Sequence, residues 1–387
     1  MTNSFDIKTW LFWLLVLHVS IISVSIAAAS FSLALTLLLL AVLTFKEKKW
    51  ILPETSIDHA VIAYIIIEFV TAVNSDQTVD ALRNSKRLLL IGIVYATVIA
   101  VNSKERFRQG ILLLSASVAV LSLVEIYFYY MHGNERLYVF QHYMTTGGLK
   151  MIIALILIPF ILSDATEKRD RIYFTAAFVP VILALILTNT RSAWLGLVCG
   201  LLVISILYYR KLFSILIAAI ILFFAFAPVQ QVDRAKSILD FTNSTNVGRL
   251  HMWSTGIRMW KDRPLLGFGD IDLYDAYLTY RTPTGDEPAG HLHNNYVHLL
   301  VTLGTIGTGI VLFLFFKVLQ TEYRVFKRYS VDPFFRNIAL GSIAVFSGFI
   351  VNGLFEWNFG DHEIMVFVWF TVGLCFAAQS VAERHIS

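Results

Sequence analysis

Long apolar runs separated by short polar loops make up most of the chain. A run of about 17–25 predominantly apolar residues is long enough to cross a bilayer as one α-helix. The pattern predicts twelve such spans and therefore an all-α polytopic membrane protein. The predicted spans are Trp10–Ile26, Ala28–Phe45, Ile57–Val73, Leu88–Val101, Phe107–Met131, Gly148–Ser163, Ile172–Leu187, Ala193–Tyr209, Leu212–Ala227, Asn295–Phe316, Phe335–Leu354 and Glu363–Ala382.

One long polar segment, residues 230–293, interrupts this pattern. It separates residues 1–229, which carry nine predicted spans, from residues 294–387, which carry three, within a single membrane domain. Inside the segment, Asn246 is a candidate N-cap for a helix that runs to Asp262 and is stopped by Arg263 and Pro264. Apolar residues recur on one face of this helix at spacings of three and four, so it is predicted to lie on the membrane surface or over the mouth of the bundle. These residues are Leu250, Trp253, Ile257 and Trp260.

Composition supports a membrane protein and excludes several other classes. The 387 residues are 57% hydrophobic and 15% charged, whereas soluble domains are typically about 25% charged. The basic residues are dispersed over many short loops, so a nucleic-acid partner is not expected. Both cysteines, Cys199 and Cys375, lie inside apolar runs, which argues against a disulfide framework.

The charges of the short loops predict the orientation. Lysines and arginines are concentrated in the loops on the side of the N-terminus, for example at Lys46, Lys48 and Lys49. Short cytoplasmic loops carry an excess of Lys and Arg, so both termini are predicted to be cytoplasmic. The polar segment 230–293 then faces outward, toward a periplasm or the exterior.

Three histidines, His291, His293 and His298, lie where this polar segment meets the next apolar run. Imidazole titrates near neutral pH and can accept a hydroxyl proton, so His293 is the best candidate general base. Asn294 can cap the following helix and aim its N-terminus at the same point. The histidines could instead bind zinc, but the sequence offers no nearby carboxylate to complete a set. No metal and no other cofactor is therefore expected.

Two outward-facing arginines complete the principal candidate site. Arg191 lies in a very short turn between two apolar runs, and Arg249 lies near the start of the predicted loop helix. A guanidinium stays charged at physiological pH and binds phosphate through two parallel hydrogen bonds. Arginines beside a helix N-terminus indicate an anion site rather than a cation site.

Other polar residues on the outward side are weaker candidates for binding substrate. Positive charges there could bind phosphate or lipid head groups, and the carboxylates of Glu356 and Asp361 could orient a histidine. The residues selected as candidate substrate-binding groups are Arg83, Lys86, Arg87, His291, Asn294, Arg258, Arg263 and Asp361.

Three motifs resemble those of the O-antigen ligase and polymerase superfamily, and most closely those of bacterial lipopolysaccharide O-antigen ligases. The first is Thr188-Asn189-Thr190-Arg191, with Leu195 completing an Arg-x-x-x-Leu pattern. The second is Gly248-Arg249-Leu250, followed by a helix and Pro264-Leu265-Leu266-Gly267-Phe268-Gly269. The third and most specific is His293-Asn294, then nine residues to Gly304, then Gly307.

This resemblance implies a GT-C-like fold of about 12 transmembrane helices with one large periplasmic loop that contains short helices. It also implies a metal-independent, inverting glycosyltransferase of the bacterial inner membrane. Such enzymes move a glycan from an undecaprenyl pyrophosphate carrier onto a lipid A–core acceptor at the periplasmic face. The functional histidine and arginines of the family map onto His293, Arg191 and Arg249.

Three alternatives remain open from the sequence. An O-antigen polymerase would use the same donor with a lipid-linked glycan as acceptor, and a protein O-oligosaccharyltransferase would use it with a protein acceptor. A transporter or flippase would need paired charges deep within several helices or two related halves, and the sequence shows neither. Glycosyl transfer is therefore favoured over transport.

Overall fold

The protein is all-helical in the computed structural model, which describes residues 6–48, 52–282 and 290–384. The helices are α1 (Ile7–Ile21), α2 (Ile26–Glu47), α3 (Asp58–Val73), α4 (Thr78–Asn84), the 3-10 helix η1 (Ser85–Ile91), α5 (Gly92–Ala100), α6 (Lys104–His132), α7 (Tyr143–Leu162), α8 (Lys168–Leu187), α9 (Arg191–Leu207), α10 (Lys211–Phe226), α11 (Val229–Lys236), α12 (Ser244–Asp262), α13 (Tyr274–Tyr280), α14 (Asn295–Arg328), α15 (Pro333–Asn352) and α16 (His362–Arg384).

Each of the twelve predicted spans falls on a helical part of the chain, and the fold is that of a polytopic membrane protein. Among the described residues, seven helices are long and apolar enough to cross a membrane by themselves: α2, α6, α7, α8, α14, α15 and α16. The apolar helices α1, α9 and α10 are shorter. The fourth predicted span is divided between η1 and α5. Length and composition therefore support about seven of the twelve spans individually.

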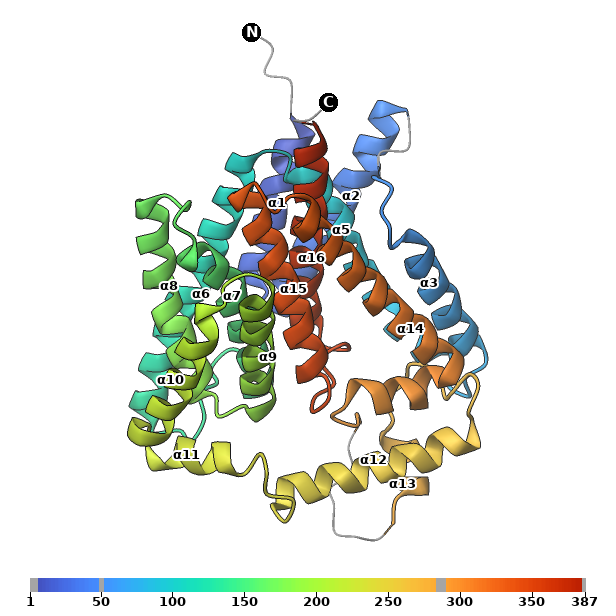
Figure 1. Ribbon diagram of the computed structural model, residues 1–387. Coiled ribbons are helices and arrows are strands. Elements are labelled where there is room, and N and C mark those ends of the chain that lie inside the picture. The colour runs from blue at the N-terminus through green and yellow to red at the C-terminus, as the bar shows by residue number, and fades with distance from the viewer. Residues whose placement is uncertain (1–5, 49–51, 283–289, 385–387) are drawn as a thin grey trace.

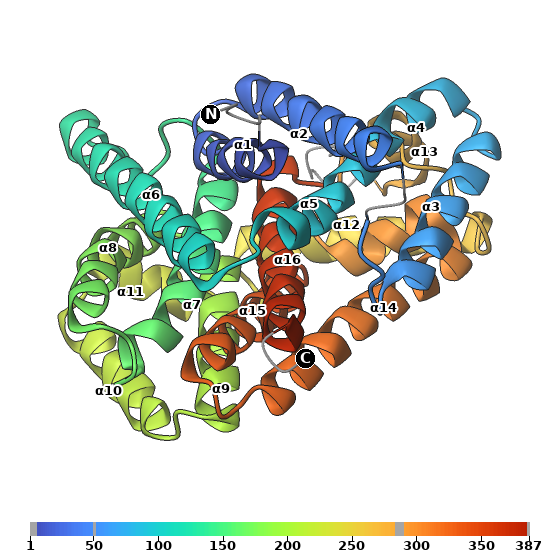
Figure 2. The ribbon, with the colours of Figure 1, turned by 90° about the horizontal axis from the view of Figure 1, so that it is seen from above.

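The central helices of the bundle are buried, and the chain termini and the polar segment lie at opposite ends of the bundle. Most residues of α7, α15 and α16 are buried, whereas most residues of α2, α6 and α8 are not. Helix α1 begins and α16 ends at one end of the bundle, and α11, α12 and α13 cross the opposite end (Figure 1). Figure 2 shows α9 and α10 on one side of α16 and α3 and α4 on the other. The polar segment thus covers one mouth of a helical bundle.

Helix α14 is broken at Gly304, and the polar segment binds to the break. The backbone of Gly304 has φ 65° and ψ −172°, a conformation that is essentially restricted to glycine. The N–H of Thr305 donates to the carbonyl of Pro264 (2.8 Å), and the N–H of Gly269 donates to the carbonyl of Thr302 (2.8 Å). The part of α14 before the break runs beside α12, and the part after it enters the bundle (Figure 1).

This break corrects the predicted span Asn295–Phe316, because residues 295–303 form a separate half-helix at the mouth of the bundle. The amphipathic loop helix exists, but Asn243 rather than Asn246 accepts the N-capping hydrogen bond of α12. Asn246 instead donates to the carbonyls of Ser237 and Asp240. Part of the predicted apolar face of α12 packs on protein: Trp260 contacts a buried cluster, and the indole N–H of Trp253 donates to the Leu292 carbonyl (3.1 Å), whereas Leu250 is exposed.

Candidate active site

His293 lies against a carboxylate that is 63 residues away in the sequence. The Nδ1 atom of His293 is 3.1 and 3.2 Å from the two carboxylate oxygens of Glu356. Glu356 belongs to the loop between α15 and α16, residues 353–361. A carboxylate can only accept here, so Nδ1 carries the proton and Nε2 is left as the basic nitrogen. This is the arrangement that a general base requires.

The chain builds this pair by fastening the start of α14 to the Glu356 loop. Asn294 caps α14 by accepting hydrogen bonds from the N–H groups of Tyr296 and Val297, as predicted from the sequence. Its amide also donates to the Leu354 carbonyl (2.8 Å). The backbone N–H of Asn295 donates to the Gly353 carbonyl (2.7 Å).

His293 itself has an unusual backbone for a residue other than glycine, with φ 44°. Positive φ values at such residues cost free energy and are concentrated at functional sites. The turn that precedes Arg191 shows the same feature, because Asn189 has φ 52°. A left-handed backbone conformation thus occurs at His293 itself and two residues before Arg191.

The charges around Glu356 keep it ionised. Burial by itself would raise the pKa of Glu356, but the hydrogen bond from His293 and the positive charge of Arg249 hold that pKa below its usual range. The pKa of the His291 imidazole is lowered, first by burial and then by His293. Its ring centroid is 4.3 Å from that of His293. At neutral pH Glu356 is thus a carboxylate and His291 a neutral neighbour.

Arg191 is buried at the first position of α9. One terminal nitrogen of its guanidinium donates to the carbonyl and the hydroxyl of Ser237, at 2.8 and 3.0 Å. Its other terminal nitrogen is buried and has no hydrogen-bond partner in the described part of the chain. A buried donor without a partner is costly, and an anion at this point would remove that cost.

Arg249 and two arginines that the sequence did not single out, Arg136 and Arg234, share this region with Arg191. The pKa of Arg234 is lowered to about 10, first by burial and then by the positive charges of Arg136, Arg191 and Arg249. Burial also lowers the pKa of Arg249. Within residues 6–48, 52–282 and 290–384, none of the four forms an ion pair with a carboxylate within 4.0 Å. We call these four residues the arginine cluster.

The loop before α7 and the turn before α9 contact each other and position the arginine cluster. The loop between α6 and α7 carries Arg136, whose guanidinium carbon lies 4.2 Å from the ring centre of Tyr143. The hydroxyl of Thr190, beside Arg191, donates to the Tyr143 carbonyl (3.0 Å). Arg234, in α11, donates to the carbonyl of Asn189 (3.2 Å). Guanidinium groups that act on one another and form no ion pair within the described residues are suited to binding a polyvalent anion.

The weaker candidates on α4 and η1 have different environments. Arg83 is exposed and pairs with Asp80, three residues earlier on α4. Arg87 is bound by two carboxylates, those of Glu68 and Asp270, each at 3.2 Å. These ion pairs tie η1 to α3 and to the polar segment, which gives Arg87 a structural role. Lys86 is exposed and lines a cavity described below.

The remaining candidates stabilise the polar segment and the last outer loop. Arg258 donates to the Tyr280 carbonyl (3.0 Å), and Arg263 pairs with Asp76. Asp361 caps α16 by accepting from the N–H groups of residues 363 and 364, and its other oxygen accepts from the Thr145 hydroxyl (2.7 Å). Of the two carboxylates considered as orienting groups, Glu356 and not Asp361 contacts His293.

One premise of the argument against a metal was wrong, because the fold supplies the missing carboxylate. Ligand atoms of His291, His293 and Glu356 all lie within 4.8 Å of one another, a spacing that could hold a metal ion. The positive charge of Arg249 also acts on Glu356. The Glu356 carboxylate would attract a divalent cation here, and the charge of Arg249 would oppose its binding.

The comparison with protein families agrees with the motifs. Residues 176–313 match the family model described as O-Antigen ligase. The matched segment contains all three motifs, including Arg191, Arg249 and His293. No curated protein matches the chain. The resemblance inferred from the motifs is thereby confirmed over this segment.

Proposed function

Because the chain carries a domain of the O-antigen ligase family, we propose that it is an O-antigen ligase. In this proposal it transfers a glycan from undecaprenyl pyrophosphate onto the lipid A–core of lipopolysaccharide, at the periplasmic face of the bacterial inner membrane. Both termini are then cytoplasmic, and α11–α13 face the periplasm. The observation that carries the proposal is the contact of His293 with Glu356, a carboxylate on which Arg249 of the arginine cluster also acts.

The arginine cluster stabilises the pyrophosphate leaving group. Cleavage of the glycosyl–phosphate bond leaves negative charge on a lipid pyrophosphate. Fixed guanidinium groups stabilise that charge without the reorganisation that water would need. Arg191 has one buried terminal nitrogen without a hydrogen-bond partner among the described residues, and Arg249 acts on Glu356. Both lie within the residues that match the family model.

His293 activates the acceptor hydroxyl as a general base. Its Nε2 atom accepts the proton of the attacking sugar hydroxyl, while Glu356 holds Nδ1–H and stabilises the imidazolium that forms. The new glycosidic bond forms as the bond to the pyrophosphate breaks, and the configuration at the anomeric carbon is inverted. Binding two membrane-anchored substrates at one mouth of the bundle supplies further rate through proximity.

The decisive experiment combines a deletion strain with complementation by a His293→Ala variant. Loss of the protein should give lipopolysaccharide without O-antigen, while long glycan accumulates on the carrier lipid. Lipid A–core that carries a single repeat would indicate a polymerase instead. The variant should be expressed and inserted normally but should fail to restore transfer, because the base is missing. Full-length O-antigen on lipopolysaccharide in the variant strain would refute the role of His293.

A further inference from the structure

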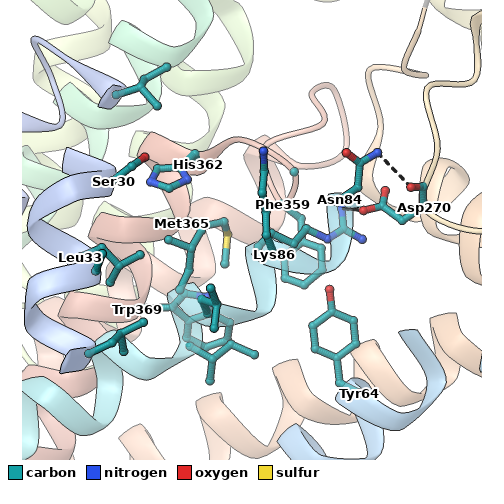
Figure 3. Close-up of a pocket in the computed structure, with 18 of the residues that line it drawn as sticks. Ser30, Leu33, Tyr64, Asn84, Lys86, Asp270, Phe359, His362, Met365 and Trp369 are labelled. Carbon is teal, nitrogen blue, oxygen red and sulfur yellow. Dashed lines mark hydrogen bonds and ion pairs between the residues drawn. The ribbon is translucent and has the colours of Figure 1, made fainter. Parts of the chain in front are cut away.

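A cavity opens beside the Glu356 loop, on the side away from the arginine cluster. Its volume is about 570 Å³, within the range of about 300–1,000 Å³ that is typical of ligand sites. Its walls come from α2, η1, the start of α16 and the loop before α16, and Leu33, Met365 and Trp369 are among the lining side chains (Figure 3). The lining is mostly apolar, so the cavity suits hydrocarbon chains.

The rim of this cavity carries positive charge that the fold does not neutralise. Lys86 is exposed, and no ion pair of its ammonium group exists among the described residues. Its side chain stands over the cavity, and His362 lies across from it beside Ser30 (Figure 3). The Nε2 atom of His362 is buried and has no hydrogen-bond partner in the described chain. Arg87, by contrast, is already paired with Glu68 and Asp270.

The cavity adjoins the His293–Glu356 pair through a single residue. Trp357 lines the cavity, and its chain neighbour Glu356 contacts His293. The ring of Trp357 also lies 3.9 Å from that of His298 on α14. The arginine cluster is built from α9, α11, α12 and the loop before α7, whereas the cavity is built from α2, η1 and α16. Figure 2 shows α9 and α11 on the other side of α16 from α3 and α4. Glu356, on which the charge of Arg249 acts, and Trp357, which lines the cavity, are thus neighbours in one loop.

We propose that this cavity binds the acyl chains of the acceptor, a phosphorylated glycolipid, with a phosphate of that lipid at Lys86. The assignment to the acceptor rests on the proposed function. An inverting displacement needs the nucleophile on the opposite face of the sugar from the leaving group. The arginine cluster takes the pyrophosphate, so the cavity on the opposite side of His293 receives the other lipid. An exposed lysine recognises phosphate as a point charge, which fits a lipid that must be exchanged at every turnover.

The test measures binding of the purified full-length protein to the acceptor glycolipid, by native mass spectrometry in detergent. Two variants perturb the cavity: Lys86→Gln removes the charge, and Ala34→Trp fills the mouth from α2. Their matched controls are Lys261→Gln, at an exposed position of α12, and Ala41→Trp, at an exposed position of α2 outside the cavity. Each protein is measured with the phosphorylated acceptor, with the same lipid after removal of its phosphates, and with phosphatidylglycerol as competitor.

The Lys86→Gln change should weaken binding of the phosphorylated acceptor about tenfold, the size of one charge-assisted contact, and should leave binding of the dephosphorylated lipid unchanged. Ala34→Trp should weaken both, and the controls should weaken neither. Equal effects of Lys86→Gln on both lipids, or competition by phosphatidylglycerol as strong as that of the acceptor, would overturn the proposal. Binding is scored without turnover, so a protein that binds acceptor as expected but transfers no glycan would refute the proposed function alone.

Discussion

The contact between Glu356 and His293 gives the sharpest prediction about the mechanism. Replacing Glu356 by Gln keeps the shape of the side chain but removes its charge. A hydrogen bond to a charged group contributes about 1.5–3 kcal/mol, and a neutral one about 0.5–1.5 kcal/mol. The difference of about 1–2 kcal/mol corresponds to a fall in kcat of roughly 5- to 30-fold, because each 1.4 kcal/mol is tenfold. The KM values for donor and acceptor should change little, since Glu356 acts through His293 and not on either substrate.

The assay is steady-state transfer by purified protein, with donor and acceptor varied separately. Glu356→Asp keeps the charge and should restore part of the lost kcat, which a purely structural role of the side chain would not predict. Thermal unfolding of each variant serves as the control for folding. A Glu356→Gln enzyme with the kcat of the parent protein would refute the role of the carboxylate in holding the imidazole. A large rise in KM with unchanged kcat would assign Glu356 to substrate binding instead.

Four further predictions test other parts of the structure. Arg191→Lys should lower kcat/KM at least tenfold, because one ammonium group cannot reproduce the planar fork of the guanidinium; near-normal turnover would show that charge alone suffices. Arg234→Gln should raise the KM for the pyrophosphate donor about tenfold and leave that for the acceptor unchanged, and the reverse pattern would remove Arg234 from the donor site. Treatment with EDTA should leave transfer unchanged, whereas loss of activity that a divalent ion restores would establish a metal at His291, His293 and Glu356. Gly304→Ala should destabilise the fold by about 3 kcal/mol or more, because a Cβ there would lie 2.2 Å from the Leu265 carbonyl oxygen. Gly309→Ala is the matched control, since its Cβ would meet no described atom within 4 Å beyond its chain neighbours and the backbone of its own helix. Equal melting temperatures of the two variants would refute the role of the break.

The amino-acid sequence was enough to predict a polytopic membrane protein and to select Arg191, Arg249 and His293 as candidate residues. Apolar periodicity is a local property, so each predicted span fell on helical chain. The sequence also predicts the capping role of Asn294, because an N-cap depends on residues only two or three positions away. The motifs around Arg191, Arg249 and His293 lie within residues 176–313, which match the O-Antigen ligase family model.

Tertiary structure alone decided which of these residues meet and what stands beside them. Glu356 lies 63 residues from His293, and both carboxylates of the last outer loop were equally plausible partners until the fold directed Asp361 to the cap of α16. Arg136 and Arg234 lie in segments without a recognisable motif. Their chemistry appears only when two distant turns bring four like charges together.

The break in helix α14 likewise depends on the tertiary structure and not on the local sequence. The sequence places Gly304 in an apolar run that is long enough to span the membrane, and nothing local in that run requires a break. The break exists because the backbone of residues 264–269 forms hydrogen bonds to the opened helix. A pattern of apolar residues records which segments avoid water. The pairing of backbone groups between distant segments depends on the three-dimensional path of the chain, and that path determines where His293 points.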